Sequence, residues 1–90
     1  MRIAGYIDHP TMKISILHMN FRYAIKFEID GMEQTIKIRE SASVKTAKDI
    51  KSLITSEILE KIENQFNELS RIKIEILKNS IQDDDFEEII

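Results

Sequence analysis

The chain has 90 residues, a formal net charge of -3 and no cysteine. The lack of cysteine excludes disulfides, thiolate nucleophiles and zinc sites with sulfur ligands, and it suits a reducing compartment. No apolar run approaches the ~18 residues of a membrane span, and residues 1 to 7 are too short for the hydrophobic region of a signal peptide. We therefore expect a cytoplasmic protein with no membrane partner.

The charge is distributed unevenly along the chain. Residues 1 to 78 hold all 13 Lys and Arg side chains against 11 Asp and Glu, which makes this part +2, whereas residues 79 to 90 contribute -5. The whole-chain charge therefore hides a slightly basic body. We expect a single α+β domain over residues 1 to 80 and an acidic C-terminal tail over residues 81 to 90.

The first segment, residues 1 to 7, has apolar residues or glycine at alternate positions and predicts a strand that ends at the turn-forming cluster Asp8-His9-Pro10. Further along, apolar and polar residues alternate on both sides of Met19-Asn20, where a two-residue loop would close a hairpin because Asn tolerates positive φ. This loop predicts that Ile16 lies opposite Tyr23 and Ile14 opposite Ile25.

The strongest local signal is the dipeptide Asp30-Gly31, which stands between two alternating segments and is typical of two-residue hairpin turns. The pairs that it predicts are Ile25 with Ile36 and Tyr23 with Ile38. Together the two hairpins and the first strand predict a four-stranded antiparallel meander with one apolar face and one polar face.

The period then changes to that of helices. Thr46 with Asp49 three residues later resembles a capping box and predicts a short helix that ends near Leu53. Thr55 followed by an acid in the first turn predicts the start of a second helix, with its apolar stripe facing the sheet. The predicted core consists of Ile14, Ile16, Tyr23, Ile25, Phe27, Ile36, Ile38, Ile54, Ile58, Ile62, Phe66 and Leu69.

Residues 71 to 76 allow two interpretations, because they continue the helical stripe and also alternate like a strand. We expect helix to about Lys78, with a fifth strand as the alternative. A helix over residues 56 to 78 would span ~34 Å at 1.5 Å per residue, longer than strands of this size. The apolar overhang, with Ile72, Ile74 and Ile76, then needs a cover, so we expect a homodimer.

The predicted architecture is thus an antiparallel four-stranded meander followed by a short helix and a long C-terminal helix packed on one sheet face. In element order, residues 1 to 70 resemble one repeat of the Whirly and purine-rich-element-binding families, which implies binding of single-stranded nucleic acid. Such binding combines cations with exposed aromatic side chains. Here we expect Phe21, Tyr23 and Phe27 on the apolar face and only Tyr6 on the polar one.

No pattern predicts a catalytic, metal or cofactor site. Nothing in the spacing of His9, His18 and the run Asp83-Asp84-Asp85 brings them together, and no glycine-rich loop or nucleophile elbow is present. An enzyme is therefore not supported, although a deep pocket next to His18 would revive that possibility.

The polar face of the predicted sheet is basic, with a net charge of +3 once its acids Glu28, Asp30 and Glu33 are counted. The predicted registers set Arg22 opposite Arg39 and Lys13 opposite Lys26, which are unfavourable like-charge pairs. Residues that break a local rule sometimes mark function. The basic side chains expected on this face are Arg2, Lys13, Arg22, Lys26, Lys37 and Arg39, of which all but Arg2 are candidate nucleic-acid contacts.

The acidic tail ends in apolar residues and is similar to the peptide tip by which bacterial single-strand-binding proteins recruit partners. Its candidate partner-binding residues are Asp84, Asp85, Phe86, Ile89 and Ile90. The tail could also fold back over the basic sheet and mask it. The sequence thus favours a small non-enzymatic interaction module, acting as a homodimer and meeting a protein partner through the tail or the sheet face; the alternative is a single-stranded nucleic-acid binder that uses the basic face.

Overall fold

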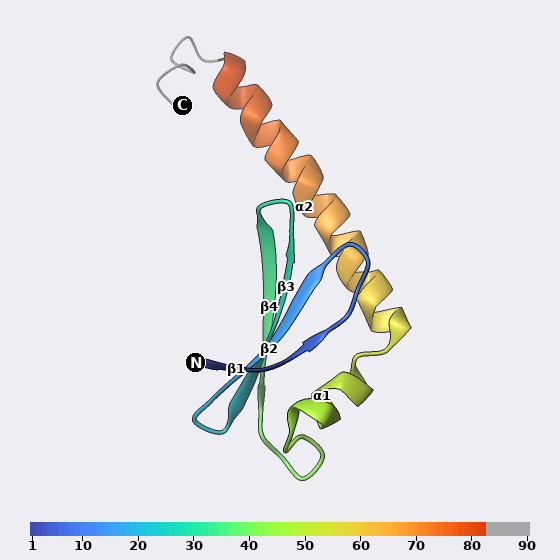
Figure 1. The fold of residues 1–90 in the computed structure, drawn as a ribbon. Helices are drawn as coiled ribbons and strands as arrows, with labels where there is room; N and C mark the ends of the chain where they lie inside the picture. The colour runs from blue at the N-terminus through green and yellow to red at the C-terminus, as the bar shows by residue number, and fades with distance from the viewer. Residues whose placement is uncertain (83–90) are drawn as a thin grey trace.

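The structure, a computed structural model, describes residues 1–82 and consists of four strands followed by two helices (Figure 1). The strands form one open antiparallel sheet in the order β1-β2-β3-β4, so every strand pairs with its neighbour in sequence. The predicted α+β meander is confirmed. The elements are β1 (Arg2–Ile7), β2 (Lys13–Met19), β3 (Arg22–Ile29), β4 (Met32–Arg39), α1 (Ala47–Leu53) and α2 (Ser56–Gln82).

The β3–β4 hairpin has the predicted register. Its turn residues Asp30 and Gly31 both have positive φ, at 47° and 73°, as the tight two-residue turn requires. Ile25 lies opposite Ile36, and the neighbouring pairs follow in the same register. The Asp30-Gly31 dipeptide therefore predicted the register of this hairpin correctly.

The predicted β2–β3 register is wrong by two residues. The loop is Asn20-Phe21, so Ile16 lies opposite Ile25 and Ile14 opposite Phe27. Because the shift is even, the side chains within β2 and β3 keep their predicted faces. The change also places Lys13 opposite Glu28 in place of Lys26, which removes one of the two predicted like-charge pairs.

Two residues, Phe21 and Arg2, do not lie on the faces of the sheet that the sequence predicted. Phe21 lies in the β2–β3 loop with φ 63° and is 73% exposed, so it does not join the apolar face. A β-bulge between Ile3 and Gly5 shifts the start of β1, and Arg2 pairs with His18, which packs against Tyr23 on the side of the helices. Arg2 is therefore absent from the outward face, whose net charge falls from the expected +3 to +2.

Both helix starts are confirmed. The Thr46 Oγ1 accepts from the backbone N–H of Asp49 at 3.2 Å, and the Asp49 carboxylate accepts from the Thr46 N–H at 3.1 Å, which completes the capping box of α1. The Thr55 Oγ1 accepts from the N–H of Ile58 at 3.3 Å at the start of α2. Since α2 is helical from Ser56 to Gln82, the alternative of a fifth strand is wrong.

The core lies between the sheet and the two helices. Ile14, Ile16, Ile25 and Phe27 are its most buried side chains from the sheet, and Ile62 and Phe66 reach it from α2, as predicted. The prediction fails for Ile36, which is 41% exposed because it lies on the edge strand, where the helices leave it uncovered. The buried residues absent from the predicted core are the hydrophobic Met12, Ala24, Val44 and Ile50 and the polar Ser15.

Helix α2 runs obliquely along one end of the sheet. It passes the β1–β2 loop, where the Thr11 hydroxyl donates to Glu63 at 3.4 Å, and reaches the β3–β4 turn, where the Lys73 ammonium donates to the carbonyl oxygen of Asp30 at 3.1 Å. Beyond Lys73 the helix continues past the sheet (Figure 1). Over residues 1–82, neither helix combines the length and the apolar character that crossing a membrane requires.

Candidate binding surfaces

The outward face of the sheet, turned away from both helices, carries the five predicted basic contact residues. Strand alternation and the observed registers place Lys13 on β2, Arg22 and Lys26 on β3, and Lys37 and Arg39 on β4 on this face. The structure divides them into two groups with different surroundings, one at each end of the sheet.

At the end near the β3–β4 turn, the cations are balanced by acids. The Lys26 ammonium lies 3.1 Å from the Glu28 carboxylate and 3.5 Å from that of Glu33. Its hydrogen bond to Glu28, together with the negative charge of both acids, raises the pKa of Lys26. Because Lys26 already forms ion pairs with Glu28 and Glu33, it is a poor candidate for binding an external phosphate.

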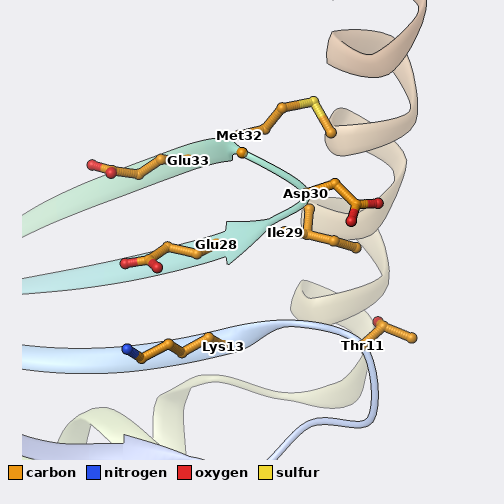
Figure 2. Close-up of a pocket in the computed structure, with 8 residues that line it drawn as sticks. Thr11, Lys13, Glu28, Ile29, Asp30, Met32 and Glu33 are labelled. Carbon is orange, nitrogen blue, oxygen red and sulfur yellow. The ribbon is translucent and has the colours of Figure 1, made fainter.

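A shallow hollow lies at the same end of the sheet (Figure 2). Figure 2 shows Lys13, Glu28 and Glu33 projecting to one side from three adjacent strands, while Ile29 and Met32 point toward α2. The charged side chains have opposite signs and lie on an open surface, so the hollow lacks the buried acid, base or nucleophile that catalysis needs.

At the other end of the sheet lies the cationic corner, formed by Arg22, Lys37 and Arg39. Arg22 and Arg39 are directly opposite one another, as predicted, and all three side chains are exposed. Phe21 precedes Arg22 in the exposed loop, and Met19 and Asn20 border the same corner. Among residues 1–82 these three cations form no ion pair, so an exposed aromatic ring lies beside unpaired positive charge at one place. This was not predicted, because alternation placed Phe21 on the apolar face.

A small polar cluster holds the segment after β4 against the helix-facing side of the sheet. The His18 Nε2 lies 2.8 Å from the Glu40 carboxylate, and the His18 ring contacts the Tyr23 ring with centroids 4.5 Å apart. The Tyr23 hydroxyl donates to the Lys45 carbonyl oxygen at 2.9 Å. Burial, with the nearby charges of Glu40 and Asp49, raises the pKa of Tyr23. A phenol that stays protonated and donates to a backbone carbonyl positions a loop and is not a nucleophile.

The free end of α2, residues 74–80, together with the neighbouring Ile72, carries a group of exposed aliphatic side chains. Ile72 and Ile74 are each 51% exposed, Ile76 is 61% exposed and Leu77 is 49% exposed. Charged side chains surround them, but no part of the sheet covers them. A cluster of half-exposed aliphatic side chains on one helix is typical of an interaction surface.

Among residues 1–82, no three His, Asp or Glu side chains converge in a way that could hold a metal ion. The predicted partner-binding residues Asp84, Asp85, Phe86, Ile89 and Ile90 lie outside the described residues. Comparisons with protein-family models, with curated proteins and with solved structures found no match.

Proposed function

We propose that this protein is a non-enzymatic binding module that acts as a homodimer. The free end of α2 forms part of the contact between the two copies, and the outward face of the sheet meets a macromolecular partner. The observation that carries the proposal is that Ile72, Ile74, Ile76 and Leu77 are each about half exposed, on a helix that extends beyond the sheet of its own chain. The absence of cysteine from the sequence suits a reducing cytoplasm, where we place this function.

The size of the chain supports association. A domain this small buries only about 60% of the surface that its unfolded chain exposes, so a second copy adds substantially to its apolar contacts. A helix of 27 residues extends ~40 Å, whereas strands of eight residues extend about 26 Å. The difference indicates a stretch of helix that the sheet of the same chain does not cover, and we propose that a second copy covers it.

Sedimentation velocity over a wide range of protein concentration tests this proposal. We expect a dimer of the wild-type chain, and a monomer with unchanged helix content when Ile72→Lys and Ile76→Lys are combined. The control is Leu53→Lys, which adds the charge of one of these two substitutions at a similarly exposed aliphatic position on α1 and should leave the dimer intact. A wild-type chain that stays monomeric at every concentration contradicts the proposal.

A second candidate function is binding of single-stranded nucleic acid at the cationic corner. It is favoured by Phe21, whose ring stands exposed in a strained backbone conformation next to Arg22 and Arg39. Stacking of a base on an aromatic ring beside phosphate-binding cations is the usual mode of such proteins. Strain retained at an exposed aromatic residue agrees with a functional role.

Titration of labelled oligonucleotides at several salt concentrations tests the second candidate. Each phosphate contact contributes about 0.7 to the slope of log affinity against log salt for a single strand. Arg22→Glu with Arg39→Glu should abolish binding and Phe21→Ala should weaken it, while Lys48→Glu, an exposed cation on α1, should change it little. If the wild-type chain shows no affinity even at low salt, this candidate is rejected and the interaction module stands alone.

A further inference from the structure

The two edges of the sheet differ in their readiness to pair with another strand. On the β1 edge, the bulge between Ile3 and Gly5 interrupts the ladder, and bulges commonly protect an edge from pairing with a second chain. Strand β4 forms the other edge with eight residues, Met32–Arg39, all paired to β3 without interruption. The β4 edge is therefore regular enough to accept a further strand.

The hydrogen-bond pattern shows which residues of β4 face this edge. The backbone N–H of Glu40 donates to the carbonyl oxygen of Phe21 at 2.8 Å, just beyond the end of the β3–β4 ladder. Since backbone groups of a strand alternate in direction, the even-numbered residues of β4 bond to β3. The residues whose N–H and C=O point to the free edge are Glu33, Thr35, Lys37 and Arg39.

The charges of the β3–β4 hairpin are poorly matched within one chain. Arg22 lies opposite Arg39 at one end and Glu28 lies opposite Glu33 at the other, and each like-charge pair is unfavourable. Lys26 compensates Glu28 and Glu33 at the second end. Within residues 1–82, Arg39 makes no ion pair within 4.0 Å.

We propose that β4 pairs antiparallel with β4 of a second copy, with Ile36 opposite Ile36 of that copy. This arrangement rests on the proposed dimer and specifies its contact. A two-fold axis through Ile36 places Glu33 of each chain opposite Arg39 of the other, so each unfavourable end of one hairpin meets the complementary end of the other. Ile36, left 41% exposed by the helices, packs against its own copy.

The two neighbouring registers each leave one of the four edge-facing residues without a partner in the second β4 strand. A shift by two residues in one direction sets Lys37 opposite Lys37 of the second copy. The opposite shift sets Lys37 opposite Glu33 of the second copy, which is favourable, but it sets Arg39 opposite Gly31 in the turn, so Arg39 loses its strand partner. Of these three registers, the one centred on Ile36 pairs all four edge-facing residues, with Glu33 opposite Arg39 at both ends.

The same two-fold axis brings the exposed apolar groups together. It places Phe21 of the second copy level with Met32 of the first, two strand spacings or about 10 Å away. This is the corner of the sheet from which α2 continues past the β3–β4 turn (Figure 1). A pair of short strands alone buries less than the ~800 Å² per partner of a standard interface, so Phe21 and the free end of α2 supply the additional apolar contact.

A charge swap tests this pairing. Glu33→Arg and Arg39→Glu each place like charges across the proposed interface twice, and each should weaken the dimer about tenfold. Within the chain each change relieves a like-charge pair, because residue 33 faces Glu28 and residue 39 faces Arg22. Arg39→Glu should therefore fold at least as stably as the wild type, and Glu33→Arg, which also gives up the ion pair with Lys26, should fold about as stably. The double variant should recover the wild-type dimer.

Recovery in the double variant is diagnostic, since residues 33 and 39 lie ~20 Å apart along one strand and cannot compensate each other within a chain. Sedimentation equilibrium gives the dimer dissociation constants, and Lys48→Glu controls for a charge change of the size made by Arg39→Glu. Single variants that dimerise like the wild type, or a double variant that stays weak, overturn the β4 pairing while the α2-mediated dimer stands. A monomeric wild-type chain overturns both proposals.

Discussion

Two isoleucines on α2 give a quantitative test of what covers the free end of this helix. Ile62 is 8% exposed and packs in the core, whereas Ile76 is 61% exposed beyond the last contact of the helix with the sheet. Replacing each with alanine removes the same atoms from nearly the same side of one helix. The difference between the two variants therefore reports on the surroundings of the two side chains alone.

The expected magnitudes differ widely. Ile62→Ala should lower the free energy of unfolding by about 2–5 kcal/mol, as other buried isoleucines do, which is a large part of the ~5–13 kcal/mol expected for a chain of this length. In a single chain, Ile76→Ala should change it by less than about 0.5 kcal/mol, because little packing is lost and alanine favours the helix. In a dimer that buries Ile76, the loss should rise to about 2 kcal/mol per chain.

Urea denaturation at a low and a high protein concentration separates these cases, because only the dimer responds to concentration. We expect Ile76→Ala to match the wild type at low concentration and to fall below it at high concentration, while Ile62→Ala is destabilised at both. An equally large loss for Ile76→Ala at both concentrations would show that Ile76 packs within its own chain, and would refute the reasoning.

Four further predictions concern single features. Thr46→Ala should lower the free energy of unfolding by about 1 kcal/mol and Thr46→Ser by much less, because only alanine removes the capping oxygen; thermal unfolding measures both. Hydrogen bonds from the N–H groups of Lys45 and Thr46 hold the pKa of Asp49 below its ordinary value near 3.8. The ionised carboxylate therefore adds to the free energy of unfolding at neutral pH, and this contribution is lost as the pH falls through the lowered pKa. In acid titrations followed by unfolding, Asp49→Asn should lose less stability than the wild type. Phe21→Gly should raise the free energy of unfolding, measured in urea, by about 1 kcal/mol, because glycine adopts a φ of 63° without strain. A decrease would indicate that a partner buries the Phe21 ring. Deletion of residues 81 to 90 should strengthen the binding of polyanions at low salt, and unchanged affinity would rule out masking by the tail.

Local signals predicted most of the fold. The Asp30-Gly31 turn, the Thr46 capping box and the helical period of α2 each depend on neighbours in sequence, and each gave the observed structure. The β2–β3 loop was misplaced because Asn20 fits a positive φ at either loop position, and only the cross-strand partners decide between the two. The bulge in β1 lies next to Gly5, and an isolated glycine in a strand pattern is a signal for a bulge that the sequence prediction did not use.

The candidate surfaces were less predictable than the fold. The face of each basic residue on β2, β3 and β4 followed from alternation, and the even error in register did not alter it. The compensation of Lys26, in contrast, depends on which strands bring acids alongside it. The exposure of Phe21 and Ile36 depends on where a loop closes and how far α2 reaches across the sheet, which are properties of the whole fold.

The sequential order of the strands has a consequence for synthesis of the chain. Every strand pairs with its predecessor, so the sheet is complete once β4 has left the ribosome, and short-range pairing of this kind forms rapidly. Helix α1 ends 14 residues after β4, but α2 ends 43 residues after it, which at ~5–20 residues per second takes about 2–9 s. During that interval Ile16, Ile25 and Phe27 face water, so the newly made sheet is a substrate for chaperones until α2 arrives.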